Sequence, residues 1–194
     1  MPKIVDHEQR RREVLSAARR VIVRDGIDAA TTRAIAKEAG YSNGVLAHYF
    51  TDKDEILLSA LRQSHQRIRE RLARKVEGVS GLAALRELLL DNLPLDAERT
   101  QETRLEVSFW SRSLASELLA DVQRAEAAEL RTAVRALLAQ ARLAGELTTE
   151  ANLDDVTEQL LALVDGLSLH LLLYPERLRR VDLERLLLQF VDQL

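Results

Sequence analysis

The chain has 194 residues, of which 46% are hydrophobic and 30% charged, with seven glycines, three prolines and no cysteine, which excludes collagen-like, disulfide-stapled and disordered chains. The lack of cysteine also excludes thiolate catalysis and cysteine-bound zinc or iron–sulfur centres, and a core of this size needs no metal or cofactor. The net charge of −3 divides unevenly: residues 1–75 carry 16 Lys and Arg against 10 Asp and Glu, and residues 76–194 carry 12 against 21.

Apolar residues recur at spacings of three and four along nearly the whole chain, which predicts an all-α fold of about nine helices. The expected helices cover residues 8–25, 32–39, 43–49, 52–75, 82–92, 98–115, 117–144, 152–174 and 176–193. Thr31 and Ser42 are the expected N-caps of the second and third helices. Gly26 and Gly40 are expected to end the first and second helices, because glycine adopts positive φ without strain.

The second and third predicted helices, joined through a short glycine turn, have the geometry of a helix-turn-helix, whose second helix lies in the DNA major groove. Apolar residues that can pack this unit on the first helix are Ile35, Ala36, Ala39, Val45, Leu46 and Phe50. The remaining residues carry hydrogen-bonding or basic side chains, or are a glycine that lets DNA approach the backbone closely. These candidate DNA contacts are Thr32, Arg33, Ser42, Asn43, Gly44, His48, Tyr49 and Lys53. The basic balance of residues 1–75 agrees with a polyanion partner, although charge blocks are more often solvated helix faces. A small helical hairpin with a polar face and no partner is the alternative interpretation.

Residues 10–57 resemble the DNA-binding domain of the TetR family of one-component regulators. The matching motifs are Thr31-Thr32, Ile35-Ala36, Ala39-Gly40, Ser42-Asn43-Gly44, His48-Tyr49-Phe50 and Lys53. The resemblance implies a three-helix DNA-binding domain over residues 1–53, a helical ligand-binding and dimerisation domain over residues 54–194, and DNA contacts at the eight candidate residues. Ala47 stands where the family often has an aromatic residue, so a contact from that position is absent here.

The acidic remainder holds candidates for a ligand site. Residues 106–110 and 161–167 resemble the subgroup of the same family that includes choline-responsive repressors. The candidate ligand-binding residues are His65, Glu106, Phe109, Trp110, Val164, Leu167, His170 and Tyr174. His65 falls on the apolar stripe of its helix, and an inward-facing polar residue needs a partner. Aromatic rings and the carboxylates of Glu106 and Asp165 would suit a cationic ligand; an apolar or mixed metabolite fits as well, and each residue alone could be ordinary core.

The last two long helices are leucine-rich on more than one side, so most of their surface must be covered. The simplest cover is the same pair of helices from a second copy, which would give a homodimer with a two-fold four-helix interface. Burial of both helices inside one monomer is the competing account.

Together these features predict a ligand-responsive DNA-binding transcriptional regulator. The resemblance implies a repressor that a small-molecule inducer releases from a palindromic double-stranded DNA operator; a helical protein-binding adaptor without DNA binding is the alternative. No Glu-x-x-His pair, glycine-rich phosphate loop or Ser-His-Asp motif is present, so we expect no enzyme, no catalytic residue and no metal site. No apolar signal core precedes residues 8–13, and apolar runs such as residues 167–174 are too short for a bilayer, so we expect a cytoplasmic protein without membrane contact.

Overall fold

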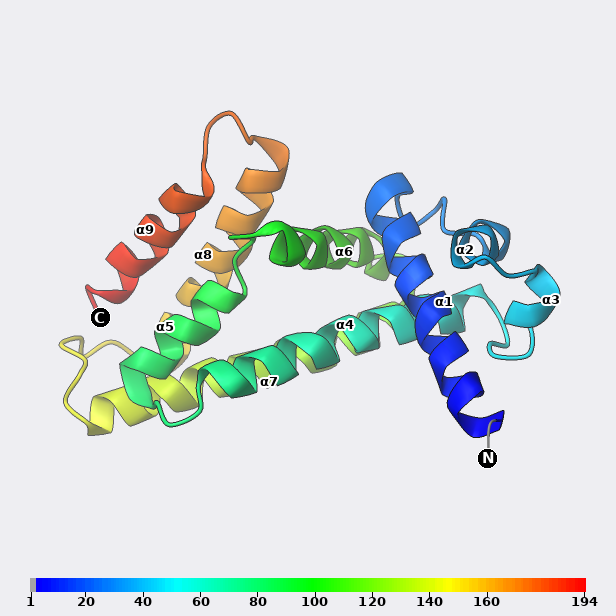
Figure 1. The fold of residues 1–194 in the computed structure, drawn as a ribbon. Helices are drawn as coiled ribbons and strands as arrows, with labels where there is room; N and C mark the ends of the chain where they lie inside the picture. Colours follow the sequence, from blue (N-terminus) through cyan, green and yellow to red (C-terminus); the bar gives the residue numbers. More distant parts are fainter. Residues whose placement is uncertain (1–2) are drawn as a thin grey trace. The chain divides into compact units, whose positions relative to one another are not determined.

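A computed structural model describes residues 3–194, with side chains from His7 onward. This described part contains nine α-helices and no β-strand, which confirms the predicted fold class (Figure 1). The helices are α1 (Lys3–Asp25), α2 (Thr32–Ala39), α3 (Asn43–Leu46), α4 (Lys53–Lys75), α5 (Gly81–Asp91), α6 (Ala97–Ser113), α7 (Glu117–Leu143), α8 (Leu153–Leu173) and α9 (Arg180–Val191).

The described chain divides into two compact units, each with its own interior. The first unit consists of the residues up to Arg67 together with Leu105–Ala120. The second unit consists of Ile68–Arg104 and Asp121–Leu194. Helices α4, α6 and α7 therefore contribute residues to both units, whereas α1–α3 belong to the first and α5, α8 and α9 to the second.

In the first unit, α2 packs on the apolar stripe of α1, because both helices are amphipathic. The α1 residues of this stripe are completely or almost completely buried: Val14, Ala18, Val21 and Ile22. On the outer side, Arg20 and Arg24 of α1 donate to the two carboxylate oxygens of Glu38 in α2, at 2.7 and 2.9 Å. These hydrogen bonds lower the pKa of Glu38 below its usual value. Apolar contact and ion pairing thus hold α2 in one position on α1.

In the second unit, α5 and α8 both contact α9 around a leucine-rich interior. Leucines of this interior that are at most 1% exposed include Leu85, Leu89, Leu138, Leu160, Leu183 and Leu187. The carbonyl oxygen of Leu194 accepts hydrogen bonds from the amides of Thr148 and Thr149, at 2.7 and 2.5 Å. The loop after α7 is therefore held against the end of the chain.

Three helix boundaries differ from the predicted ones by more than two residues. Helix α1 begins at Lys3 rather than at residue 8 because the intervening residues contain no glycine or proline that would stop it. Helix α3 ends at Leu46 because the amides of His48 and Tyr49 bond to carbonyls three residues back, which tightens the last turn. Helix α9 begins at Arg180 rather than at residue 176 because the Asp182 carboxylate accepts from the backbone amide of its N-cap residue at 3.1 Å.

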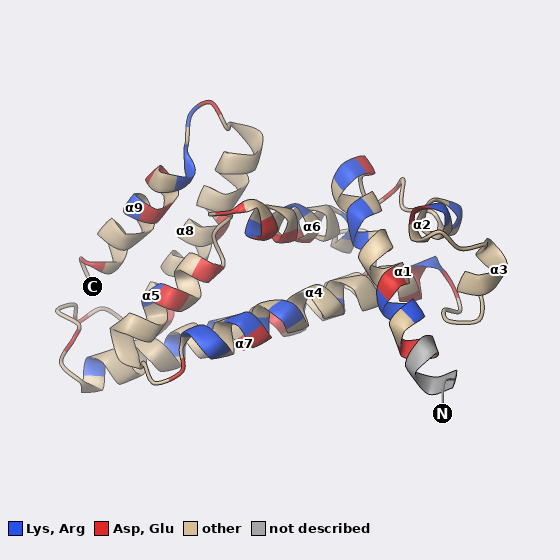
Figure 2. Ribbon diagram, viewed as in Figure 1, with Lys and Arg blue, Asp and Glu red and all other residues tan. Residues whose placement is uncertain are grey.

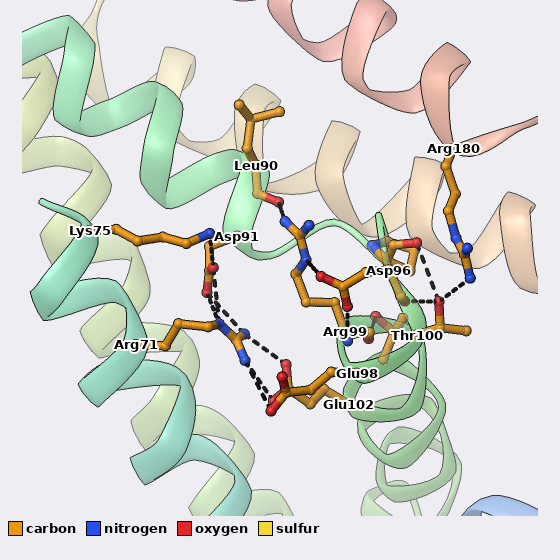
Figure 3. A network of polar contacts seen from close by, with 12 residues as sticks. Arg71, Lys75, Leu90, Asp91, Asp96, Glu98, Arg99, Thr100, Glu102 and Arg180 are labelled. Carbon is orange, nitrogen blue, oxygen red and sulfur yellow. Dashed lines mark hydrogen bonds and ion pairs between the residues drawn. The ribbon is translucent and has the colours of Figure 1, made fainter.

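A buried ionic network in the second unit joins α4, α5 and α6 (Figure 3). The Arg71 guanidinium donates to both oxygens of Asp91, at 3.0 Å each, and to both oxygens of Glu102, at 2.9 and 2.7 Å. Lys75 donates to Asp91 at 2.7 Å. Burial alone would raise the pKa of Asp91, but the hydrogen bonds and charges of Arg71 and Lys75 outweigh it and leave the pKa below its usual value. We call these four residues the Arg71 network.

Helix α8 is the one helix of the described chain that is long and apolar enough to cross a membrane by length and composition alone. The sequence-based expectation of no membrane span considered uninterrupted apolar runs, whereas α8 meets the criterion as a whole helix whose mean hydropathy is high despite its polar residues. Core helices of water-soluble proteins pass the same test. One side of α8 lies in the interior of the second unit, where Val156 and Leu160 are buried.

Candidate functional site

The local signals at the helix-turn-helix produce the predicted caps. The Thr31 hydroxyl accepts from the Ala34 amide at 3.2 Å, and the Ser42 hydroxyl accepts from the Val45 amide at 3.3 Å. Gly40 has a φ of +76° and ends α2 in the left-handed conformation that favours glycine. Two capped helices separated by a three-residue turn therefore form here, as the sequence predicts.

Burial divides this motif into an inner and an outer side. The inner side comprises Ile35, Ala36, Leu46 and Phe50, all at most 5% exposed, and Ala39 and Val45 are half-buried. On the outer side, six of the eight predicted DNA contacts are exposed: Thr32, Arg33, Ser42, Asn43, Gly44 and His48. Tyr49 and Lys53 are half-buried. The apolar side is thus buried inside the first unit, and the polar side is exposed and can contact a partner.

Arg11 bonds the end of the recognition segment, the residues from Asn43 to Phe50, to its neighbours, a role for which no local sequence pattern is a signal. Its guanidinium donates to the Tyr49 carbonyl at 2.6 Å and to the Glu55 carboxylate and the Ser59 hydroxyl at 3.2 Å each. The same guanidinium lies over the Phe50 ring, 4.3 Å from its centroid. Arg11 therefore holds α1, the residues after α3 and the start of α4 together.

The start of α4 carries Lys53 and is capped by the residues around it. The Asp52 carboxylate accepts from the Glu55 amide at 2.8 Å. The Glu55 carboxylate accepts from the Thr51 amide at 2.7 Å and from the Thr51 hydroxyl at 3.0 Å. The backbone hydrogen bond from Thr51 is the largest cause that lowers the pKa of Glu55. This cap fixes the first turn of α4, where a lysine and helix amides can both meet an anion.

The carboxylates near the motif are engaged in bonds within the protein. Glu38 is held by two arginines of α1, and Glu13 accepts a 2.5 Å hydrogen bond from the Tyr41 hydroxyl, which lowers the pKa of Glu13. Figure 2 shows Lys and Arg on α1 and α2, whereas α3 carries no charged residue. Glu38 is therefore paired with two positive charges of α1, and the Glu13 carboxylate is oriented toward Tyr41.

Four of the predicted ligand-binding residues lie in the first unit. His65 is 8% exposed, and its Nε2 lies 2.9 Å from the Glu106 carboxylate, so the inward-facing histidine has the partner it was expected to need. The other oxygen of Glu106 accepts from the Trp110 indole at 3.3 Å. Phe109 is completely buried, and Trp110 is half-buried. The structure thus brings His65, Glu106 and Trp110 together.

The other four predicted ligand-binding residues lie on α8 and just after it, in the second unit. Val164 and Leu167 belong to the leucine-rich interior. His170 and Tyr174 are exposed, and their rings meet edge to face with centroids 5.6 Å apart. The guanidinium of Arg177 lies 5.7 Å from the Tyr174 ring. These residues therefore separate into a buried pair and an exposed pair.

Comparison with known proteins gives matches to both parts of the chain. Residues 14–60 match the family described as bacterial regulatory proteins, tetR family, and residues 81–194 match the family described as BetI-type transcriptional repressor, C-terminal. The HTH-type transcriptional regulator PksA of Bacillus subtilis is 32% identical over 195 residues, which cover 100% of this chain and 94% of that protein.

Solved structures agree with these sequence matches. A transcriptional regulator from Rhodococcus sp. Rha1 has 29% sequence identity and a TM-score of 0.83, with 93% of each chain covered. A regulator from Saccharomonospora viridis, solved in complex with choline, has 22% identity and a TM-score of 0.90, with 95% of this chain and 96% of that chain covered. The chain therefore belongs to the TetR family of bacterial transcriptional regulators, with a C-terminal region of the BetI type.

Proposed function

We propose that this DNA-binding regulator is a cytoplasmic repressor that a small-molecule inducer releases from a palindromic operator. In this proposal residues 1–53 form the DNA-binding domain, and residues 54–194 form the ligand-binding and dimerisation domain. The observation that carries it is the outer side of the helix-turn-helix, where hydrogen-bonding side chains are exposed while the apolar side is buried. The inducer must bind the released state more tightly than the operator-bound state, because equal affinity would shift nothing.

The DNA contacts are tested by replacing Tyr49 with phenylalanine and Lys53 with alanine in one variant. Removal of a phenolic hydroxyl and an ammonium that bind phosphate is expected to weaken operator binding about 10- to 100-fold, at roughly 1 kcal/mol or more for each contact. The measurement is fluorescence anisotropy with a duplex recovered by the wild-type protein from fragmented genomic DNA. The dimer, followed by sedimentation, should be unchanged.

Arg74→Ala is the matched control for this variant, because it removes one positive charge from an exposed residue of the last turn of α4. It should leave operator affinity within about twofold of wild type, since a residue outside the phosphate contacts contributes only a screened long-range term. Equal affinity of the double variant and the wild type would contradict the contact assignment. A wild type that recovers no duplex at all would favour the adaptor alternative.

The homodimer is proposed to form through α8 and α9. Along one side of α8, Ala162, Gly166 and Leu173 are exposed and Leu169 is half-buried, at the three- and four-residue spacing of a single helical face. An apolar helix face with small residues suits close packing on another helix. We propose that a second copy, rather than lipid, covers this face.

Gly166→Arg is expected to convert the dimer into a monomer. Gly166 is exposed, and a Cβ added there meets no atom of another element within 4 Å, so the isolated protein can accept a side chain at this position. A long charged side chain would nevertheless block a partner helix. Sedimentation velocity at micromolar protein measures the change, and operator affinity should fall with it because two half-sites can no longer be bound together. Gly166→Ala is the control and should stay dimeric. A dimeric Gly166→Arg variant would show that α8 does not form the interface by this face.

We infer that the inducer is a small organic cation that contacts Glu106 and Trp110. A carboxylate next to an indole is the chemistry that attracts an ammonium group, and His65 holds one oxygen of that carboxylate in place. The relative from Saccharomonospora viridis was solved with choline, which is such a cation. The exposed pair His170 and Tyr174 is a second, separate set of candidate ligand contacts.

Thermal unfolding with choline tests this inference. A ligand at about 100 times its Kd stabilises the folded state by about 2.7 kcal/mol, which corresponds to a rise of roughly 5–10 °C in Tm for a chain of this size. The uncharged dimethylbutanol isostere of choline should give no rise, and Glu106→Gln should abolish the rise with choline. Equal shifts for the two compounds, or an unaltered shift in Glu106→Gln, would contradict the cation site.

A further inference from the structure

An aromatic contact places His7, in the second turn of α1, next to the recognition segment. The His7 and Tyr49 rings have centroids 4.5 Å apart, with an angle of 51° between their planes. His7 is exposed and Tyr49 is half-buried, so one ring leans on the other while the imidazole nitrogens remain accessible to a partner. This part of α1 precedes the helix-turn-helix by more than twenty residues and lies outside the eight proposed DNA contacts.

Arg11 fixes the position of this turn. Residues four apart lie on the same side of an α-helix, so Arg11 follows His7 by one turn on the same face. Because the Arg11 guanidinium bonds to the Tyr49 carbonyl at 2.6 Å and to Glu55 at 3.2 Å, the α1 backbone cannot move away from the end of the recognition segment without losing these bonds. His7 is therefore held beside Tyr49 by a second, independent set of contacts.

We propose that His7 is a further DNA contact, which donates a hydrogen bond to a phosphate oxygen next to the phosphate bound by Tyr49. The inference rests on the proposed operator binding. A neutral imidazole has one N–H donor and a protonated one has two, and both can pair with phosphate. Phosphates follow one another closely along each strand, so neighbouring donors of one rigid surface meet successive phosphates. The DNA interface then includes α1 as well as the helix-turn-helix and the start of α4.

Three substitutions of His7 separate a phosphate contact from a supporting role for the ring. His7→Ala removes ring and donor, His7→Phe keeps the ring against Tyr49 but removes the donor, and His7→Arg supplies a permanent cation. The control is Gln9→Ala, because Gln9 lies on the opposite side of α1 and bonds to Glu13. Operator affinity is measured by fluorescence anisotropy between 50 and about 200 mM salt, the range over which phosphate contacts dominate the change in affinity.

His7→Ala and His7→Phe should both weaken operator binding about 3- to 10-fold, the effect of one lost hydrogen bond, with Gln9→Ala unchanged. His7→Arg should keep the affinity, and where the wild-type imidazole is neutral it should steepen the slope of log K against log salt by about 0.9, because a permanent cation then pairs with the same phosphate. Wild-type affinity in His7→Phe would overturn the proposal, and so would a loss of affinity in His7→Arg as large as that in His7→Ala. Failure of operator binding as a whole would instead appear in the wild-type protein and in the Tyr49→Phe, Lys53→Ala variant.

Discussion

Replacement of Arg11 by methionine is expected to weaken operator binding by about 10- to 100-fold and to lower the free energy of unfolding by about 2 kcal/mol, since hydrogen bonds to a charged group are lost. Arg11 joins the Tyr49 carbonyl, Glu55 and Ser59. Without it, the end of the recognition segment and the first turn of α4 lose their common anchor, and the proposed phosphate contacts at Tyr49 and Lys53 are no longer held in place. Anisotropy titration and urea unfolding measure the two effects.

Arg11→Lys separates the geometry of this anchor from its charge. Lysine keeps the positive charge, but a single ammonium cannot reach a carbonyl, a carboxylate and a hydroxyl with the fork of a guanidinium. It should therefore lose most of the operator affinity that Arg11→Met loses. If Arg11→Lys binds the operator as tightly as wild type, then the charge alone matters and the anchoring role is refuted. Arg12→Met is the matched control, because Arg12 is exposed on another side of α1.

Interactions that close within three or four residues were predictable from the sequence. Thr31, Ser42 and Gly40 each act on backbone groups of their own turn, so residue type and spacing were sufficient to place them. The contacts of Arg11 with Tyr49 and of Arg71 with Asp91 span 38 and 20 residues, and no periodicity in a single sequence encodes such a pairing. The predicted start of α9 is wrong because the leucine pattern begins before the helix does. The helix begins where the Asp182 carboxylate caps the Arg179 amide, and the apolar spacing does not reveal this cap.

The two candidate sites differ in how far the sequence could describe them. A DNA-binding face is the polar side of an amphipathic unit, so alternation of polar and apolar residues was enough to find Asn43 and His48 exposed. A ligand pocket and a hydrophobic core have the same apolar periodicity, so the periodicity that made Val164 and Leu167 candidate ligand contacts also fits their burial in the leucine-rich interior. A polar residue on an apolar helix face is more informative, because a buried histidine needs a polar partner. His65 is such a residue, and its partner is Glu106.

Arg71→Met is expected to destabilise the protein by about 3–5 kcal/mol at pH 7, the usual result when one partner of a buried ionic network is removed. The Asp91 side chain is 0% exposed and the Glu102 side chain 7%, so neither carboxylate can turn to water once the guanidinium is gone (Figure 3). Arg74→Met changes an exposed arginine of the same helix in the same way and should alter stability by less than about 0.5 kcal/mol. Urea unfolding of the three proteins gives both values.

The pH dependence of this difference distinguishes charge from packing. Because the folded pKa of Asp91 lies below its ordinary value of 3.8, the stability that its ionised form contributes is fully present above that value and is lost as the pH falls through the folded pKa. In Arg71→Met the guanidinium no longer offsets the burial of Asp91, so the pKa of Asp91 rises. Asp91 is then protonated at a higher pH than in the wild type, and protonation removes the free-energy cost of its buried charge. The two stabilities should therefore converge between pH 7 and about pH 4. A constant difference across this range would assign the effect to lost packing of the arginine side chain, whereas convergence assigns it to the buried charges that join α4, α5 and α6.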